Sequence, residues 1–383
     1  MDNVIVSFAT RPGHGGEGGV GWALVEAAIH HSASIGQRIN VVIDARDLKD
    51  VALAVEHVSG SESATLHPVA LPAWAIRRWG NARTRLSYVF WLRAARRRVL
   101  QICRAGSVGV IHQVTFATAT LPAALPRSCS AKRIWGPIAL PFGRVHSPDR
   151  RPRLGSGLWL RLARLAGQFN ARRADLIIAT NDITAVKLRA GHVVEVEPNI
   201  AVTMSDWEPA AASDPKLLTV AGLLIPRKRP WLAVDALAKP DLDSYRLQFV
   251  GDGPLRSELE RRCELLGVSD RVHFAGQLEH ARVLEAIAAS RLLLHPSARE
   301  GAAWVIGEAA AVGVAAVAFA DVGCASTVKL SNNGGELAPP SHDLAASLAE
   351  ATTRALAREM PPPSTRWNRE RFEDLIAQWW SLQ

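Results

Sequence analysis

The sequence alternates short apolar runs with helix-forming segments, and this alternation occurs twice. Alanine-rich or charged stretches at helical spacing separate the runs. Buried strands that alternate with helices predict an α/β protein whose parallel sheets are covered on both faces. The apolar runs are VIVSFAT (4–10), NVVIDA (40–45), VGVIHQVTF (108–116) and DLIIAT (175–180), then KLLTVAGLL (216–224), YRLQFVGDG (245–253), RLLLHPS (291–297) and VAAVAFA (314–320).

The length of the chain predicts two domains. It has 383 residues, and single domains usually hold about 100 to 200. We expect a first domain over 1–205, which the C-terminal helix 366–383 rejoins, and a second over 206–365. Residues 201–216 contain AAASDP and are predicted to be the linker. Such domains bind ligands at the carboxyl ends of their strands.

Composition is typical of a folded protein, with 48% hydrophobic and 21% charged residues. The N-terminus lacks the pattern of a secretory signal. The longest apolar stretch, 309–320, is shorter than the roughly 18 residues of a membrane span. Cys103, Cys129, Cys263 and Cys324 have no paired spacing, so we expect neither a zinc site nor a disulfide framework. The expected location is the cytoplasm.

The positive charge is concentrated in one region. The net charge is +9, and no aspartate or glutamate occurs from 63 to 148. In FWLRAARRRVLQIC (90–103), one helical face is apolar and another carries arginines. A partner with phosphate groups or an anionic membrane would suit Arg77, Arg78, Arg93, Arg96 and Arg97, although a simply solvated face fits equally well. Nucleic acid is disfavoured because no recognised binding motif is present.

The stretch EGAAWVIGE (300–308) holds two glutamates on either side of a predicted helix start. Glu300 falls in a loop after an apolar run, and Glu308 falls about one turn into a helix that Gly313 would end. A helix N-terminus attracts phosphate. A nucleotide-sugar, with hydroxyls at both ends and a diphosphate between, would fit. The alternative is that both glutamates only stabilise the helix dipole.

An ordered set of motifs carries a family resemblance. The second half contains VAGLLIPRKR (220–229), FVGDGPLRSELE (249–260), VHFAGQL (272–278), LLLHPSAREGAAWVIGEAAAVG (292–313) and NNGGEL (332–337). The first half adds GEGGVGW (16–22), IHQVT (111–115), IWGPIALP (134–141) and EPNI (197–200). Together these resemble retaining nucleotide-sugar glycosyltransferases of family four. The resemblance implies a GT-B fold, with two Rossmann-like doubly wound domains facing across a cleft.

The resemblance also implies roles for individual residues. Glu300 would lie at the sugar ring and Glu308 at the ribose hydroxyls. Lys228 would neutralise the leaving diphosphate, and His112 would lie beside the sugar, so that His112, Glu300 and Lys228 form the catalytic set. The other donor-binding residues would be Gly15, Gly16, Gly222, Arg227, Gly251, Leu278, Gly301, Ala302, Ala303 and Trp304.

Two positions depart from the pattern of that family. Leu223 stands where an arginine usually contacts the diphosphate, and either Arg227 or Arg229 could replace it. Ala302 and Ala303 stand where phenylalanine and glycine are common. The extra Cβ of Ala303 is expected to crowd the approach of the donor.

The expected activity is retaining transfer of a sugar from a nucleoside diphosphate sugar to an alcohol acceptor. A lipid-linked or phosphate-bearing acceptor would place the protein in cell-envelope glycan or glycoconjugate synthesis, at the inner face of the membrane. We expect no metal and no cofactor beyond the donor substrate. Two other functions stay open: a sugar-nucleotide epimerase or phosphorylase on the same fold, and a non-enzymatic basic protein that binds membrane or nucleic acid.

Overall fold

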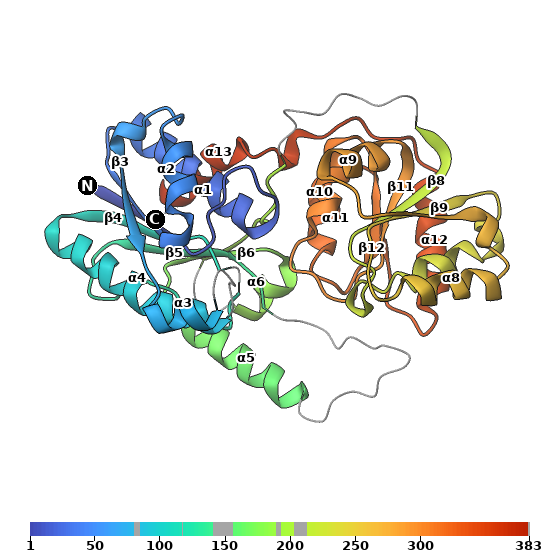
Figure 1. Cartoon of the computed structure of the whole chain (residues 1–383), viewed down its shortest axis with the longest axis horizontal. Helices are drawn as coiled ribbons and strands as arrows, with labels where there is room; N and C mark the ends of the chain where they lie inside the picture. The colour runs from blue at the N-terminus through green and yellow to red at the C-terminus, as the bar shows by residue number, and fades with distance from the viewer. Residues whose placement is uncertain (80–84, 117, 141–155, 189–192, 203–212, 382–383) are drawn as a thin grey trace. The chain divides into compact units, whose positions relative to one another are not determined.

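The computed structural model describes residues 1–79, 85–116, 118–140, 156–188, 193–202 and 213–381. The chain divides into two compact units. Unit 1 is built on Met1–Pro141, Gly157–Ala201 and Arg369–Gln383, and unit 2 on Val202–Asn368. Most of the expected linker lies outside the described residues, and the first strand after it begins at Asp214. Each unit is an α/β structure with its own parallel sheet (Figure 1).

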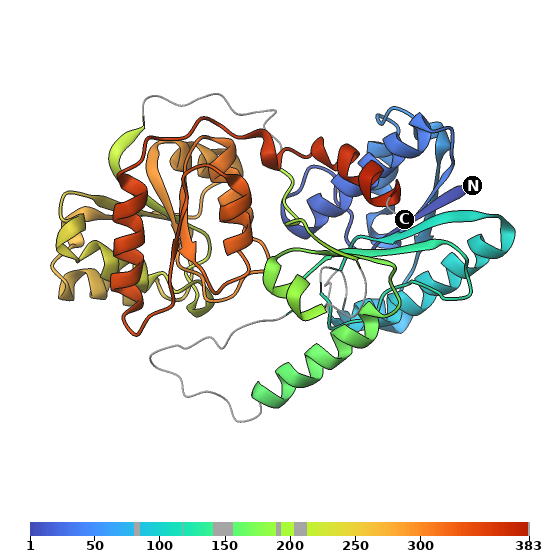
Figure 2. The ribbon, with the colours of Figure 1, turned by 180° about the vertical axis from the view of Figure 1, so that it is seen from behind.

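The sheet of unit 1 has seven strands in the order β3-β2-β1-β4-β5-β6-β7. Helices cover both of its faces, with α1 and α13 on one side and α4 on the other (Figures 1 and 2). The strands are β1 (Asp2–Ser7), β2 (Ile39–Asp44), β3 (Ala64–Val69), β4 (Val108–Gln113), β5 (Lys132–Ile138), β6 (Leu176–Ala179) and β7 (Val193–Val196). The helices are α1 (Gly16–Ser34), α2 (Leu48–Val55), α3 (Ala73–Trp79), α4 (Arg85–Ala105), α5 (Ser156–Ala171), α6 (Asp182–Leu188) and α13 (Arg371–Ser381), with short 3-10 turns η1 (Ala45–Asp47) and η2 (Ser61–Ser63).

The sheet of unit 2 has six strands in the order β10-β9-β8-β11-β12-β13. Helices α9, α10 and α11 pack together on one face, and α7, α8 and α12 pack together on the other. The strands are β8 (Asp214–Ala221), β9 (Arg246–Val250), β10 (Val272–Gly276), β11 (Ser290–His295), β12 (Ala316–Phe319) and β13 (Glu336–Ala338). The helices are α7 (Trp231–Leu237), α8 (Arg256–Leu265), α9 (His280–Ala288), α10 (Trp304–Ala311), α11 (Ala325–Ser331) and α12 (Leu344–Leu356), with 3-10 turns η3 (Pro226–Lys228), η4 (Pro240–Leu242), η5 (Ser269–Arg271) and η6 (Thr365–Trp367).

The central strands explain why apolar runs dominate the sequence. All six residues of β11 and all four of β12 are buried, as expected for parallel strands with helices on both faces. The sequence pattern missed β3 and β5. Strand β3 is only partly buried, and β5 is interrupted by Gly136 and Pro137, so neither has a continuous apolar signal.

The last helix of the chain belongs to unit 1. Helix α13 packs on α1, and Arg371 donates to Glu197 (2.7 Å) and to the carbonyl of Ile200 (2.6 Å). Arg369 forms an ion pair with Glu26 (2.9 Å). The chain therefore ends on the sheet where it began.

Both sheets share one topological feature that locates ligand sites. In unit 1 the chain runs outward from β1 to β3 and then returns to β4, on the other side of β1. In unit 2 it runs from β8 to β10 and returns to β11, on the other side of β8. Loops that leave two such neighbouring strands turn apart, and they open a crevice at the carboxyl ends of the strands. The β1/β4 and β8/β11 ends are therefore the expected ligand sites.

Candidate functional site

The loops after β8 and β11 are bonded to each other in unit 2. The amide of Ala298 donates to the carbonyl of Arg227 (2.9 Å), and the guanidinium of Arg227 donates to the carbonyl of Arg299 (2.9 Å). The hydroxyl oxygen of Ser297 also lies 3.3 Å from the Arg227 carbonyl oxygen, and its single proton is shared between this carbonyl and Glu300. These bonds hold a basic turn against the segment that carries Glu300.

Glu300 is the centre of a charged cluster at this switch point. Its Oε1 lies 2.6 Å from Nζ of Lys228 and 3.0 Å from a guanidinium nitrogen of Arg227, and the Ser297 hydroxyl donates to it (3.2 Å). The side chain is 13% exposed. Burial opposes its ionisation, but Lys228, with His295 and Arg227 adding to it, lowers the pKa of the carboxyl below its ordinary value. Glu300 is therefore an ionised, oriented carboxylate.

The structure decides which arginine can replace the one expected at Leu223. Arg229 is committed to the fold, since its guanidinium donates to the carbonyls of Pro296 (2.8 Å) and Ser297 (3.0 Å) and covers the ring of Phe319. Arg227 lies in the cluster with a half-exposed side chain. Arg227, and not Arg229, is placed to meet an anion.

Helix α10 places the second glutamate. It begins at Trp304 with Ala303 as its N-cap, and no side chain caps its N-terminus. Glu308 is buried within the helix, and its Oε1 accepts a hydrogen bond from Nε2 of His280 (2.9 Å), the first residue of α9. The bond raises the pKa of His280 above its ordinary value.

The expected crowding at Ala303 is wrong. Ala303 is 3% exposed and its side chain belongs to the hydrophobic core of unit 2, so its Cβ does not project from the surface where a donor would approach. Gly301, Ala302 and Trp304 are partly buried beside it.

Of the other donor-binding residues predicted in unit 2, Gly222 lies beside Lys228, whereas Gly251 and Leu278 contribute to packing. A Cβ added at Gly222 would lie 3.9 Å from Nζ of Lys228, so Gly222 belongs to the cluster. A Cβ at Gly251 would lie 2.2 Å from the carbonyl oxygen of Gly222, so Gly251 is required for the close packing of two loops. Leu278 packs against the core, and Leu223 is 61% exposed.

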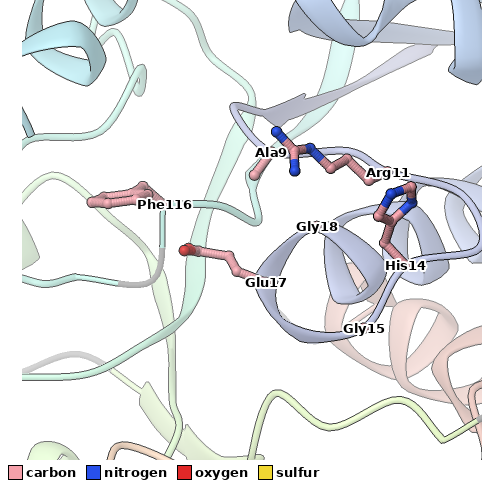
Figure 3. A pocket seen from close by; sticks show the side chains of 7 residues that line it. All are labelled: Ala9, Arg11, His14, Gly15, Glu17, Gly18 and Phe116. Atoms are coloured by element: carbon pink, nitrogen blue, oxygen red, sulfur yellow. The ribbon is translucent and has the colours of Figure 1, made fainter. Parts of the chain in front are cut away.

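Unit 1 has a cavity of about 450 Å³ at its own switch point. It lies between the loop after β1 and the segment after β4, as Figure 3 shows. The side chain of Glu17 points toward Phe116 across the cavity. The lining residues are Ala9, Arg11, His14, Gly15, Glu17, Gly18 and Phe116.

Of the two predicted glycines, Gly15 lines this cavity, and Gly16 is the next residue along the chain. Gly15 precedes α1, and Gly16 has φ +68°, which favours glycine. No described heavy atom lies within 4 Å of a Cβ added at either position. The turn therefore has open space beside both glycines, and their contact with a donor stays a prediction.

The structure places His112 in the core of unit 1, and its assignment to the sugar stays a prediction. The residue is fully buried near the end of β4. Its Nε2 bonds to the carbonyl of Gly136 (2.9 Å), and its Nδ1 accepts from the indole of Trp380 (3.2 Å). With both ring nitrogens used inside the core, His112 joins β4, β5 and α13. The side chain that reaches the cavity beyond β4 is Phe116.

The predicted basic face is formed by α3 and α4. Arg77 and Arg78 on α3 are exposed, as are Arg93, Arg96 and Arg97 on α4. The opposite side of α4 buries Trp91, Leu92, Ala95 and Val99. The amphipathic pattern of the sequence is thus confirmed, while the partner of the basic face stays a prediction.

The expectation that no cysteines pair is wrong. Cys103, near the end of α4, forms a disulfide with Cys129, which precedes β5. Cys263 and Cys324 are buried as free thiols. The disulfide pair is 26 residues apart, and no local spacing rule marks it.

Sequence reasoning also missed several residues that the fold brings to these sites. His280 and His295 reach the two glutamates of unit 2, and Arg11, Glu17 and Phe116 line the cavity of unit 1. Only the positions of Arg11 and Glu17, beside the glycine-rich turn, were a usable signal. Within the described ranges, no group of three or more histidine, cysteine or acidic side chains could hold a metal ion, and no helix is long and apolar enough to cross a membrane.

Two α/β units with parallel, doubly wound sheets are the architecture of GT-B proteins. The chain is similar over its whole length to Alr3699/HepE of Anabaena, solved in complex with UDP, with a TM-score of 0.55, 19% identity and 100% of that chain covered. This likeness shows the fold.

The second unit carries the similarity to a known family. Residues 203–371, which include nearly all of unit 2, match the model described as Glycosyl transferases group 1. Exopolysaccharide phosphotransferase SCO2592 of Streptomyces coelicolor is 34% identical over 157 residues, 40% of this chain and 16% of that protein. The phosphatidylinositol N-acetylglucosaminyltransferase gpi3 subunit of Schizosaccharomyces pombe is 28% identical over 165 residues, 42% of this chain and 36% of that protein. The chain thus matches well under half the length of either relative.

Proposed function

We propose that the protein is a retaining glycosyltransferase that moves a sugar from a nucleoside diphosphate sugar to a hydroxyl group of an acceptor. The observation that carries the proposal is the ionised Glu300 held by Lys228 and Arg227. This cluster lies at the switch point of the unit that matches the glycosyl transferases group 1 model. Such a site offers cations to a diphosphate and a carboxylate to the sugar beside it.

The reaction places its main electrostatic demand on the leaving group. The bond between the anomeric carbon and the diphosphate oxygen breaks while the acceptor oxygen bonds to the same face of the sugar. Lys228 and Arg227 would neutralise the charge that develops on the diphosphate. The leaving phosphate oxygen would take the proton of the acceptor. In this proposal side chains of the protein, and not a metal, stabilise the leaving group.

The nucleoside end of the donor is assigned to Glu308. Its carboxylate is buried in α10 and accepts one hydrogen bond, from His280. Ribose hydroxyls are also hydrogen-bond donors. They would bind the Glu308 carboxylate either in place of the His280 imidazole or together with it. The HepE structure contains UDP, which makes UDP-sugars the first donors to test.

The acceptor is assigned to unit 1. Its cavity offers the aromatic ring of Phe116 together with the charged side chains of Arg11 and Glu17. An aromatic face and a carboxylate suit a sugar, and a guanidinium suits a phosphate. The two relatives are named for an exopolysaccharide and for phosphatidylinositol, which supports a lipid-linked or phosphate-bearing acceptor.

The basic face of α3 and α4 supports peripheral contact with an anionic membrane. Its exposed arginines lie in a region without acidic residues. Binding to vesicles of anionic lipid should then fall as salt rises, and neutral vesicles should not bind. Replacement of Arg96 and Arg97 by glutamine should reduce this binding. Equal binding to neutral vesicles would contradict the assignment.

Incubation with a panel of nucleotide-sugars tests the activity. Transfer or hydrolysis releases a nucleoside diphosphate, whereas an epimerase would return an isomerised nucleotide-sugar and a phosphorylase would require inorganic phosphate. Glu300→Gln and Lys228→Ala should each lower turnover by at least about tenfold. Glu285→Gln on α9 and Lys239→Ala, both exposed and outside the cluster, are the matched controls. Turnover like that of the wild type in both cluster variants would remove these residues from the chemistry.

A further inference from the structure

The buried side chain of His295 in unit 2 has no part in the proposed reaction. His295 ends β11 and is 3% exposed. Its Nε2 has no hydrogen-bond partner among the described residues. The Oε1 of Glu300 lies 3.9 Å away, which is beyond hydrogen-bonding distance. A buried polar atom without a partner costs free energy, so its presence calls for an explanation.

The groups around His295 keep its ring neutral. Burial first, and then Lys228, Arg227 and Arg229, lower the pKa of His295 to about 3, against the opposing effect of Glu300. Cys324, whose pKa burial raises to about 12, is a neutral thiol near the same carboxylate. At neutral pH the imidazole therefore offers a hydrogen bond without a charge.

In the free protein Glu300 does not need that hydrogen bond. Lys228 and Arg227 already satisfy its Oε1 at 2.6 and 3.0 Å. Arg229 cannot change partner, because the carbonyls of Pro296 and Ser297 hold it. A donor diphosphate would compete with Glu300 for Lys228 and Arg227, since phosphate and carboxylate bind the same cations.

We propose that His295 is the positioning residue for Glu300 in the donor complex, where its Nε2–H takes over the carboxylate as Lys228 and Arg227 turn to the diphosphate. This assignment rests on the proposed function. The ring needs to close a gap of less than about 1 Å to reach hydrogen-bonding distance. A buried carboxylate that lost both cations and gained nothing would be driven toward protonation. His295 prevents this while it leaves the negative charge of Glu300 available to the sugar.

The replacement of Lys228 by His295 as the partner of Glu300 can be tested without a nucleotide-sugar. Carbon-13 NMR of the Glu300 carboxyl gives its pKa in four proteins: wild type, Lys228→Ala, His295→Leu and the double variant. In the wild type Lys228 contributes more than His295 to the lowered pKa of Glu300, so His295→Leu should raise that pKa less than Lys228→Ala does. In the Lys228→Ala background, His295→Leu should raise the pKa clearly. An equal effect of His295→Leu in both backgrounds, or no effect in either, would overturn the proposal.

A second arm measures turnover of the donor that the panel identifies. His295→Leu should lower kcat by about tenfold, the loss expected for one hydrogen bond to a charged group, with the donor KM unchanged and the acid limb of the kcat profile moved to higher pH. His295→Gln keeps an N–H donor and should restore most of the loss. Loss of thermal stability with an unchanged pH profile, or equal loss in both variants, would show a merely structural residue.

The two arms separate the proposals. If no donor is turned over, the proposed function fails, and the NMR cycle still decides whether His295 is coupled to Glu300. Should His295→Leu fail to fold, His295→Met provides a second apolar side chain for the same cycle.

Discussion

Nζ of Lys228 lies 2.6 Å from Oε1 of Glu300, although the two residues are far apart in the sequence. Lys228 is in the loop after β8 and Glu300 is in the loop after β11, and these strands are neighbours in the sheet. In the unliganded protein the ammonium group of Lys228 is therefore paired with the carboxylate of Glu300. An anionic ligand that binds Lys228, as proposed, must compete with Glu300 for it.

Lys228→Ala should weaken the binding of a nucleoside diphosphate by about tenfold, because a charge-assisted hydrogen bond to phosphate is lost. Isothermal titration calorimetry with UDP measures the change. Lys239→Ala, which removes an exposed lysine paired with Asp343, should leave the affinity unchanged. Equal affinities for all three proteins would mean that the diphosphate binds elsewhere.

Glu308→Gln should weaken the binding of a ribonucleoside diphosphate by about tenfold, since a neutral amide accepts hydrogen bonds more weakly than a carboxylate. A 2′-deoxy nucleotide should bind the wild type less well than its ribose counterpart, and the variant should distinguish the two ligands much less. Calorimetry on the two proteins and two ligands gives this coupling. If the variant still prefers ribose as strongly as the wild type does, Glu308 does not contact the hydroxyl.

The hydrogen bond between His280 and Glu308 should make stability depend on pH. The bond raises the pKa of His280 above 6.5 in the folded state, so its stabilising effect is complete below about pH 6.5 and is lost as pH rises through the raised value. Thermal unfolding of wild type and His280→Gln from pH 5.5 to 8.5 should show the gap in Tm closing toward high pH. The exposed His342→Gln is the control. A gap that widens with pH would contradict the assignment.

His112 should destabilise the fold in acid. Burial is the main cause that lowers its pKa to about 4, well below the ordinary 6.5. Between about pH 6.5 and pH 4, His112 is protonated in the unfolded chain but stays neutral in the folded protein. The contribution of neutral His112 to the free energy of unfolding is thus fully present above pH 6.5. It falls by about 1.4 kcal/mol per pH unit as the solution approaches pH 4.

Urea unfolding from pH 7 to pH 4.5 measures this dependence. His112→Gln keeps a donor for the carbonyl of Gly136 and should show a shallower loss of stability than the wild type. The same slope in both proteins would show that His112 is not a neutral core residue.

Reduction of the disulfide between Cys103 and Cys129 should lower the free energy of unfolding by about 3 kcal/mol. Urea unfolding with and without reductant measures the loss, and Cys129→Ser should reproduce it without responding to reductant. A thiol assay in denaturant should find Cys263 and Cys324 reactive before reduction. Four reactive thiols in the untreated protein would show that the pair is not formed.

The sequence predicted the parts of the molecule that local patterns encode. The apolar runs 291–297 and 314–320 became β11 and β12, and residues 304–311 became the helix that carries Glu308. The two faces of α4 also followed from spacing alone. These features depend on neighbours within one or two turns of the chain, so periodicity and helix-end signals suffice to find them.

The site was predictable only as a set of residues. The motifs indicated Lys228, Glu300 and Glu308, but not that Lys228 would pair with Glu300 or that His280 would meet Glu308. The family resemblance, together with its place at the end of a predicted strand, assigned His112 to the sugar. Whether a side chain at a strand end points into the core or out to a ligand depends on what packs over it, and here Trp380 from the last helix does so.

By itself, the sequence determined that strands and helices alternate in each half, that each half forms its own sheet, and that the paired glutamates lie in a loop and a helix. Only the tertiary structure decided which charges neutralise one another, which histidines are buried and which cysteines pair. The physical reason is that strand order in a doubly wound sheet sets which loops meet at a switch point. In unit 2, placing β8 beside β11 brings Lys228 to Glu300, and no local pattern in either segment records the other.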